Sequence, residues 1–124
     1  MPRYRYGRQH TPPAPVLPVR VGRPGAAPEI FFSALVDTGA DISVLPLGLP
    51  AQLHLPAVGR LTVAGVEGPP RSLPLYAVEV SVNGVRLIAR AVSLGTTPLI
   101  GRELINKMLM RFDGPKALLE VSFP

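Results

Sequence analysis

Glycine and proline divide this chain into short apolar segments, and this punctuation limits the folds that it can adopt. There are 12 glycines and 16 prolines among the 124 residues. Both residue types interrupt helices and central strands, so long regular elements are not expected. Between the breaks the apolar residues alternate or run together over stretches of strand length, which is typical of a small all-β fold.

The dipeptide Asn83-Gly84 is the clearest hairpin signal, because it favours the tight turn that joins antiparallel strands. It predicts strands over 72–82 and 85–92. Pro18 lies inside the predicted strand 16–21, so we expect that strand at the edge of a sheet. Further strands are predicted at 29–36, 42–45, 60–64, 109–112 and 117–121.

Helical segments are few in this prediction. Residues 102–107 form the one expected helix, near the C-terminus. The stretch 46–55 is ambiguous between a loop and a single helical turn broken by Pro50. Many short strands, regular turns and one short C-terminal helix together predict an all-β chain that closes into a small barrel.

Composition excludes several classes of protein. The chain has no cysteine, so neither a disulfide framework nor a thiolate zinc site can form. His10 and His54 have no partners at metal-ligand spacing, and we expect no metal and no cofactor. No apolar run reaches membrane-spanning length, and residues 1–8 lack the apolar core of a secretory signal. We therefore expect a cytoplasmic protein without membrane contact.

The net charge is +5, and much of it lies at the start of the chain. Residues 3–6 alternate arginine with tyrosine, a pattern that can stack on single-stranded nucleic acid. The proline-rich run 11–15 cannot form a helix or a ladder and favours a solvated tail. We expect residues 1–15 to be a disordered basic tail before one folded domain, 16–124. Because so few cations supply few phosphate contacts, we expect no nucleic-acid partner.

A single carboxylate is placed where a strand ends in a glycine turn. Asp37 follows the apolar run 31–36, and Thr38-Gly39 then closes the strand with a tight turn. A strand fixes the position of an acid at its end, and glycine lets neighbouring backbone approach closely. Most turns of this kind are only turns, and no second Asp-Thr-Gly or Asp-Ser-Gly occurs in the chain.

The interpretation of this turn depends on a later apolar segment that also ends in a glycine. The segments 35–46 and 99–105 together resemble the retropepsin family, the retroviral-type aspartic proteases. The two motifs occur in the family's order and spacing, and the resemblance extends over residues 16–123. It implies a retropepsin-like small closed β-barrel, a homodimer of two-fold symmetry, and endopeptidase activity on peptide or protein substrates without a cofactor.

The resemblance assigns roles to individual residues. Asp37 matches the catalytic acid, and Thr38 matches the residue whose hydroxyl braces the partner's loop. Gly39 matches the glycine whose backbone lines the substrate groove. Asp41 and Arg102 match an acid and a base that form a structural ion pair behind the active site, with solvated surface charge as the alternative.

Two further segments receive roles from the same resemblance. The segment 63–71 lies where the family carries its flap, a hairpin that bends over the substrate. Glu67, Pro69 and Pro70 depart from the glycine-rich pattern of that hairpin, so an ordinary hairpin loop is the alternative. The residues assigned to the flap are Ala64, Gly65, Val66, Glu67 and Gly68. Those assigned to the apolar loop beneath the catalytic turn are Leu99, Ile100 and Gly101.

Amide hydrolysis by carboxyl groups needs a base for the water and an acid for the carbonyl oxygen. Two close carboxyls that share one proton fill both roles, and aspartic proteases are the standard example. Since this chain has one motif, the mechanism requires that Asp37 of two copies meet on a two-fold axis. The apolar strand 117–123 either interleaves with the partner or pairs within its own chain, and both arrangements can hold together.

Ala40 occupies a position where many cellular aspartic proteases carry a hydroxyl that stabilises the ionised carboxylate. Its methyl group cannot do so, which predicts a less acidic pH optimum than that of digestive relatives. Two other functions stay open. One is a catalytically silent dimeric module of the same fold that binds peptides or proteins. The other, more remote, is a nucleic-acid-binding domain led by the basic N-terminus.

Overall fold

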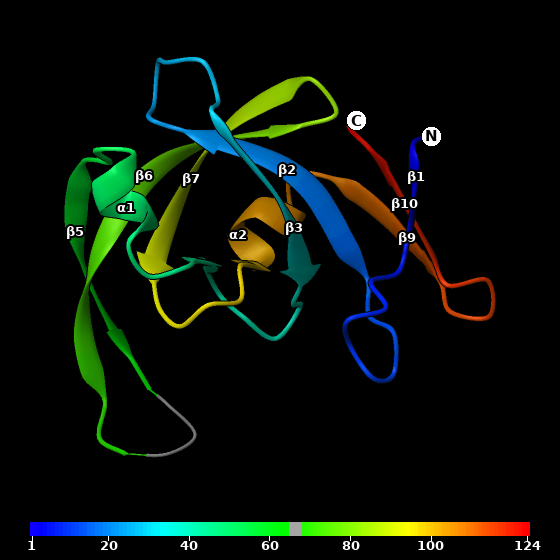
Figure 1. The fold of residues 1–124 in the computed structure, drawn as a ribbon, viewed down its shortest axis with the longest axis horizontal. Helices are drawn as coiled ribbons and strands as arrows, with labels where there is room; N and C mark the ends of the chain where they lie inside the picture. The colour runs from blue at the N-terminus through cyan, green and yellow to red at the C-terminus, as the bar shows by residue number, and fades with distance from the viewer. Residues whose placement is uncertain (65–67) are drawn as a thin grey trace.

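Strands dominate the structure, and each of its helices is a single turn. The computed structural model describes residues 1–64 and 68–124. Its elements (Figure 1) are β1 (Arg3–Arg5), β2 (Val16–Gly22), β3 (Ile30–Val36), β4 (Ser43–Leu45), α1 (Leu49–Gln52), β5 (Ala57–Val63), β6 (Arg71–Val82), β7 (Val85–Ser93), β8 (Leu99–Ile100), α2 (Arg102–Ile105), β9 (Leu109–Asp113) and β10 (Leu118–Ser122). The predicted mostly-β class is confirmed. No helix in the described part of the chain is long and apolar enough to cross a membrane.

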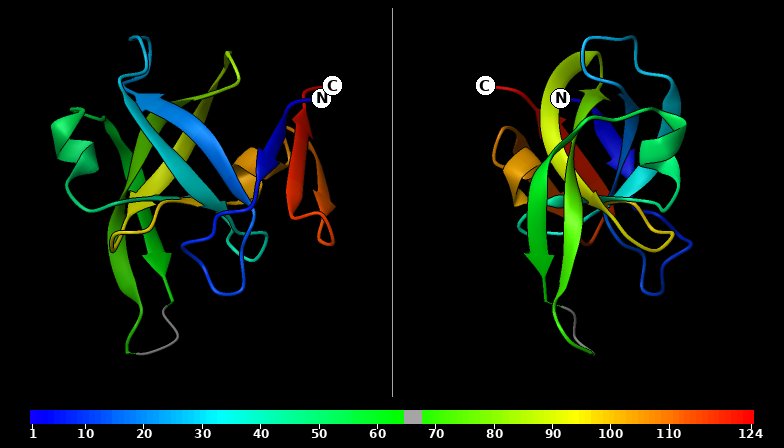
Figure 2. Two further views of the ribbon diagram at one scale, coloured as in Figure 1. Left: turned by 45° about the vertical axis from the view of Figure 1, so that its right-hand side comes forward. Right: turned by 90° about the vertical axis from the view of Figure 1, so that its left-hand side faces the viewer.

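Six strands close into a barrel, as the sequence predicts. Hydrogen-bonded neighbours follow the order β2-β3-β8-β4-β7-β6, and a further pairing of β2 with β6 completes the ring. This last pairing joins Arg20–Gly22 to residues 79–81 (Figure 2). Closure removes the open edges that a flat sheet of these strands would expose. β5 pairs with β6 alone and lies outside the ring.

The edge position expected for β2 is wrong. This strand pairs with β3 along most of its length and with β6 near its end. Pro18 is tolerated because β6 reaches only Arg20–Gly22, so the missing N–H lies outside that second pairing. The pairing with β6, which is distant in sequence, closes the barrel. A proline in the sequence of β2 carries no information about that pairing.

One hydrophobic core fills the barrel and continues beneath the second sheet. It joins buried residues of β2, β3, β6 and β7 to Leu104 of α2 and Leu119 of β10. Leu17, Leu104 and Leu119 are fully buried. Full burial of one such leucine stabilises a fold by about 1.5–3 kcal/mol. These contacts therefore hold α2 and β10 firmly against the barrel.

The segment that was ambiguous in the sequence contains a helical turn, and Pro50 lies near the start of that turn without breaking it. α1 begins at Leu49, so Pro50 lies within its first turn. The first N–H groups of a helix have no acceptor inside the helix, and a proline there loses nothing. Gly48 precedes the helix with a φ of 87°, a left-handed conformation that favours glycine.

α2 is shorter than the predicted helix 102–107, and turns follow it as far as Met108. Its side chains and those of the turns cover an open edge of β7, which β4 pairs only over residues 91–93. The Glu103 carboxylate accepts the N–H of Arg90 at 3.2 Å. The Lys107 ammonium donates to the carbonyl of Ile88 at 3.1 Å. These contacts satisfy backbone groups that would otherwise invite another strand.

The N-terminal residues form a strand, which corrects the expectation of a disordered tail for residues 3–5. β1 pairs antiparallel with β10 and places Tyr4 opposite Leu119. Side chains alternate across a strand, so Tyr4 and Tyr6 pack against the core while Arg3 and Arg5 stay exposed. The alternation of arginine and tyrosine is therefore that of a half-buried strand. The burial of the two rings offsets the entropy cost of ordering this segment.

β10 is the middle strand of the second sheet, whose order is β1-β10-β9. Both of its edges are paired within the chain. β10 therefore has no free edge for the expected interleaving of residues 117–123 with a partner. On the exposed face, Glu120 lies 3.5 Å from Arg3 and 4.0 Å from Arg111. The Val121 N–H also donates to the carbonyl of Pro2 at 3.1 Å, and the two termini lie side by side (Figure 2).

Candidate active site

A two-residue strand fixes the position of Asp37. β8 pairs in parallel with the end of β3, placing Leu99 opposite Leu35. The N–H of Leu35 donates to the carbonyl of Pro98, and the N–H of Asp37 donates to the carbonyl of Ile100, each at 2.9 Å. Leu99 and Ile100 therefore lie directly beside the strand that carries the acid, and Asp37 leaves the barrel wall at a fixed point.

The turn after β3 holds the carboxylate by its own backbone. The N–H of Gly39 donates to Oδ1 of Asp37 at 3.0 Å, and the N–H of Ala40 donates to the Asp37 carbonyl at 3.2 Å. A Cβ at position 39 would lie 3.2 Å from the same Oδ1. Glycine at this position therefore keeps the space beside the half-buried carboxyl group open.

Gly101 and Ser43 form a buried contact beneath the turn. The N–H of Gly101 donates to Oγ of Ser43 at 3.0 Å, and Ser43 is only 5% exposed. A Cβ at position 101 would lie 2.4 Å from the carbonyl carbon of Ile42, so only glycine fits. Sequence reasoning missed Ser43, although a lone hydroxyl inside the apolar run 42–45 is a usable signal of a buried hydrogen bond.

Arg102 joins the start of α2 to the turn. The backbone N–H of Arg102 donates to the carbonyl of Ala40 at 2.8 Å, and that of Glu103 donates to the carbonyl of Asp41 at 3.2 Å. The Arg102 guanidinium donates to the carbonyl of Thr38 at 3.0 Å and also forms a salt bridge with Asp41. The structure thus brings the segments 38–41 and 99–102 together around one turn.

Exposure decides how much the salt bridge itself contributes. The side chain of Asp41 is 86% exposed and that of Arg102 is 47% exposed. An ion pair this open to water stabilises a fold by at most about 1 kcal/mol. The three hydrogen bonds to the carbonyls of Thr38, Ala40 and Asp41 therefore do more to fix the turn. The salt bridge orients the guanidinium so that its bond to Thr38 can form.

The residues assigned to the flap lie on a separate element. β5 and β6 form a hairpin whose outermost pair is Val63 with Arg71. The exposed side chain of Arg60 links the two strands, since its guanidinium donates to the hydroxyl of Ser72 at 2.9 Å and to the Ser72 carbonyl at 3.0 Å. The hairpin extends past the barrel at the end where the turn after β3 lies (Figure 1).

Two of the five flap residues can be placed. Ala64 follows β5 and is exposed, and Gly68 is exposed with a φ of 82°. Gly65, Val66 and Glu67 lie outside the described residues. The left-handed backbone at Gly68 accounts for the glycine, because other residues are strained there.

The chemistry available to one chain is that of a single half-buried carboxyl group on a rigid turn. Among residues 1–64 and 68–124, no group of three or more histidine, aspartate or glutamate side chains lies close enough to hold a metal ion. A single carboxyl group can act as a base or as an acid in one step. It cannot be both at the same moment without a second carboxyl group beside it.

Comparison of the chain with known proteins gives matches at the level of structure. No protein-family model matches the chain, and no curated protein sequence matches it. Among solved structures, a retropepsin-like aspartic protease from Rickettsia conorii aligns with a TM-score of 0.72 and 18% identity, covering 98% of this chain and 89% of that one.

Two further solved structures have a similar fold. The EIAV protease in complex with the inhibitor HBY-793 aligns with a TM-score of 0.53 and 21% identity, over 75% of this chain and 86% of that one. The retroviral protease-like domain of Ddi1 from Leishmania major aligns with a TM-score of 0.53 and 15% identity, over 88% and 92%. The chain therefore has a retropepsin-like fold, as the two sequence motifs imply.

Proposed function

We propose that this chain is the subunit of a homodimeric aspartic endopeptidase. In this proposal, Asp37 of two copies meets on a two-fold axis and the pair hydrolyses peptide bonds. The observation that carries the proposal is the turn of residues 37–41, held by β8 and α2 at the end of a retropepsin-like barrel. This arrangement supplies one rigid carboxyl group per chain.

The two carboxyl groups would divide the chemistry between them. One accepts a proton from a bound water molecule, which attacks the carbonyl carbon of the scissile bond. The other donates a hydrogen bond to the carbonyl oxygen and later protonates the leaving nitrogen. No metal or cofactor takes part, because the dyad itself activates the water.

The substrate would bind as an extended strand. The β5–β6 hairpin and the Asp37 turn lie at the same end of the barrel, so a peptide between them can pair with backbone groups. In this proposal, Ala64 and Gly68 belong to the flap side. Gly39 lines the opposite side, where the absence of a side chain lets the peptide approach Asp37. Leu99, Ile100 and Gly101 support the floor.

Dimerisation would take place at the Asp37 end of the barrel, where Thr38 braces the partner's turn. β10 is paired on both edges, so the contact does not come from its addition to a partner's sheet. Arg102 and Asp41 serve this arrangement indirectly, because they fix the turn that presents Asp37 and Thr38.

The decisive experiment compares the purified chain with Asp37→Asn on a mixed peptide library, followed by mass spectrometry. We expect cleavage by the parent and none by the variant. The matched control is Asp113→Asn, which changes the aspartate at the end of β9 and should cleave like the parent. Cleavage that survives in Asp37→Asn would refute the proposal.

Subunit mixing tests the paired mechanism separately. Mixing parent and Asp37→Asn chains in equal amounts should reduce the activity of the parent to about half, because random pairing gives half of its chains an inactive partner. Activity that is unchanged by mixing, in conditions where subunits exchange, would exclude a shared active site.

A second candidate function is a dimeric module of the same fold that binds peptides without cleaving them. Pro69 and Pro70 favour it, since prolines beside the hairpin tip remove N–H donors that a substrate would use. Both the parent and Asp37→Asn would then bind peptides equally and leave the library intact.

A further inference from the structure

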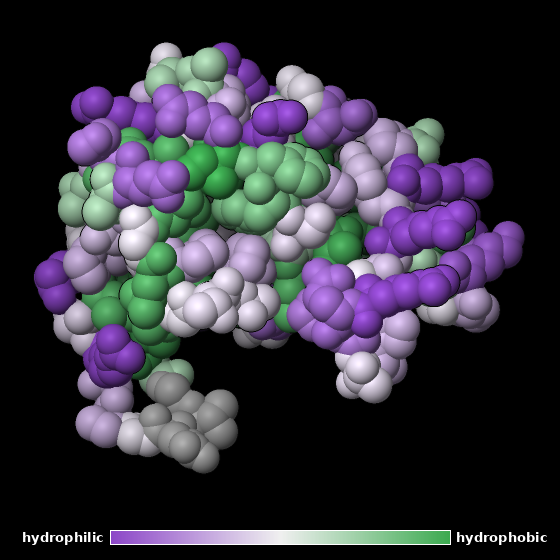
Figure 3. All heavy atoms as spheres, viewed as in Figure 1, coloured by the Kyte–Doolittle hydropathy of each residue, from purple (hydrophilic) through white to green (hydrophobic). Residues whose placement is uncertain are grey.

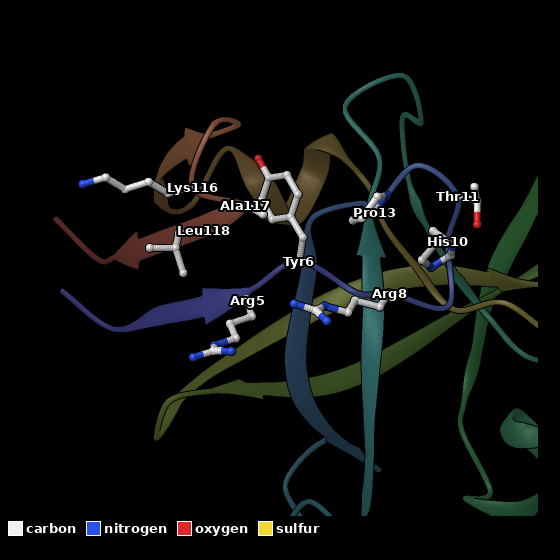
Figure 4. A pocket seen from close by; sticks show the side chains of 9 residues that line it. All are labelled: Arg5, Tyr6, Arg8, His10, Thr11, Pro13, Lys116, Ala117 and Leu118. Atoms are coloured by element: carbon white, nitrogen blue, oxygen red, sulfur yellow. The ribbon is translucent and has the colours of Figure 1, made fainter.

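A cavity of about 620 Å³ lies where the loop between β1 and β2 meets the start of β10. It is distinct from the Asp37 turn and is formed by two segments near the termini that the proposed chemistry does not use. Figure 4 shows its side chains, of which Arg5, Tyr6, Arg8, Thr11 and Lys116 matter here.

The lining is strongly cationic. Arg5, Arg8 and Lys116 carry positive charges at neutral pH, and no acidic residue is among the lining residues. In the described part of the chain none of these three side chains forms a salt bridge, whereas Arg3 and Arg111 on the same sheet share Glu120. The cavity therefore holds positive charge that its own surroundings do not neutralise.

Backbone hydrogen bonds hold this charge in place. The N–H of Gly7 donates to the carbonyl of Ala14 at 2.7 Å, and the N–H of Ala14 donates back at 3.2 Å. The N–H of Tyr6 donates to the carbonyl of Ala117 at 2.9 Å. Arg8 extends back toward Arg5, while the side chain of Lys116 points away from Arg8 (Figure 4). A recess lined by charges of one sign concentrates the field and attracts an anion.

The cavity lies close to the candidate active site. The loop that forms it leads into Pro15, whose carbonyl accepts the N–H of Val36 at 3.0 Å, one residue before Asp37. This loop and the turn after β3 project at the same end of the barrel (Figure 1). Hydrophilic side chains cover the right-hand side of the molecule in Figure 3 and are present along its top and left as well. An extended chain lying over Asp37 can therefore continue toward the cavity.

We infer that this cavity binds the acidic segment of a peptide, and that the protein prefers peptides with carboxylates beside the stretch held at Asp37. The choice of a peptide as the occupant rests on the proposed function. Arginine suits this task because its planar guanidinium pairs with a carboxylate through two hydrogen bonds. The hydroxyl of Thr11 supplies a further donor at the wall.

A nucleic acid fits the cavity less well than an acidic peptide. Binding of single strands relies on aromatic rings that are free to stack on bases. Tyr4 is instead packed against the hydrophobic core, and Tyr6, which lines the cavity, also packs against that core. The cations of the cavity are also too few for strong, salt-dependent binding to a phosphate backbone.

Binding is measured in the Asp37→Asn background, so that cleavage does not enter the result. The probes are a labelled oligoglutamate peptide and its oligoglutamine counterpart, followed by fluorescence anisotropy. We expect tighter binding of oligoglutamate, weakened by added salt. Adding Arg5→Ala and Arg8→Ala should raise its Kd by about tenfold and leave oligoglutamine unaffected.

The control variant carries Arg20→Ala and Arg23→Ala in the same background. It removes the same two charges from exposed positions of β2 and the following loop, away from the cavity. We expect the Kd for oligoglutamate to stay unchanged, and thermal unfolding should show that both variants remain folded. Equal weakening by both pairs would mean that net charge alone attracts the peptide, which would overturn the inference.

Two other results would also overturn it. One is displacement of oligoglutamate by a single-stranded oligonucleotide that binds more tightly. The other is a change in self-association, seen by sedimentation of the Arg5/Arg8 variant, with peptide binding unchanged. Selective binding of oligoglutamate without any cleavage by the parent chain would count against the protease and support the cavity assignment.

Discussion

Gly101 lies so close to Ile42 that no side chain fits between them. A Cβ at position 101 would be 2.4 Å from the carbonyl carbon of Ile42 and 2.5 Å from its oxygen. Both contacts are with backbone, so a substitution must move residue 42, which directly precedes β4. The conformation of residues 37–41 therefore depends on this glycine.

Gly101→Ala should lower the free energy of unfolding by about 3 kcal/mol, because overpacking against rigid backbone forces the chain apart. Urea unfolding followed by circular dichroism measures this. Gly114→Ala is the control, since a Cβ there meets nothing within 4 Å. Equal midpoints for the two variants would show that the contact with Ile42 is not rigid.

Ser43→Ala should lower the free energy of unfolding by about 1–3 kcal/mol, because it leaves the buried N–H of Gly101 without an acceptor. The matched control is Ser33→Ala on β3, an exposed serine for which we expect little change. Chemical denaturation gives both values. A loss no larger than that of the control would mean that the N–H of Gly101 finds another acceptor.

Arg102→Lys keeps the positive charge at position 102 but removes the hydrogen-bond geometry of the guanidinium, so it tests which of the two matters. A single ammonium group cannot bond to the Thr38 carbonyl and the Asp41 carboxylate in the geometry of a guanidinium. We expect a loss of stability of about 1 kcal/mol or less, as for other exposed pairs. If the proposed protease function holds, we expect kcat to fall by a larger fraction than the free energy of unfolding does. The reason is that the loss of the bond to Thr38 lets Thr38 and Asp37 shift.

The control for Arg102→Lys is Arg111→Lys, which changes an exposed arginine 4.0 Å from Glu120 in the second sheet. It should leave both stability and kcat close to those of the parent. A parallel fall of both quantities in the two lysine variants would remove the special role of Arg102.

Ala40→Ser should move the acid limb of the pH–rate profile toward lower pH. The added hydroxyl can donate to the ionised carboxyl pair, which favours the charged form. The measurement is kcat/KM across the acidic range with one peptide substrate. A profile identical to that of the parent would show that position 40 does not reach the pair.

Tyr4 reports on whether the N-terminal strand is docked. Burial raises the pKa of Tyr4 above 10.0, which means that the folded state holds the phenolic proton more tightly than the unfolded chain. This stability is fully present below the unfolded pKa and is lost as the pH rises through the folded pKa. Unfolding free energy should therefore decline at pH values above about 10.

Tyr4→Phe should make that alkaline decline shallower, because the substituted ring has no proton to lose. Urea unfolding at a series of alkaline pH values measures the slope for parent and variant. Identical slopes would mean that Tyr4 is not buried, and that β1 does not pack on the core as described.

Local signals in the sequence predict most of the strands. Asn83-Gly84 joins β6 to β7, and the alternation after and before it matches the observed strands. The hairpin of β9 and β10 lies where residues 109–121 predict it. These elements follow from turn chemistry and from a period of two residues, which neighbouring residues alone determine.

The predictions that the structure corrects were wrong for a different reason. Pro18 and Pro50 both predict interruption, and each is accommodated because its missing N–H lies where no acceptor is required. The basic N-terminus predicts a solvated tail, yet Tyr4 and Tyr6 find a core to pack against. Each of these outcomes depends on segments far away in the chain.

For the candidate site, the order of residues alone shows that one aspartate follows an apolar strand and lies two residues before a glycine. It also supplied the later Leu99–Arg102 segment, whose spacing resembles a known family. Three contacts become visible in the folded chain alone: β8 lies beside β3, Ser43 accepts the N–H of Gly101, and Arg102 donates to the carbonyl of Thr38. Turn and strand preferences act between neighbours, whereas these contacts form only once the closed barrel has brought distant backbone groups within hydrogen-bonding distance.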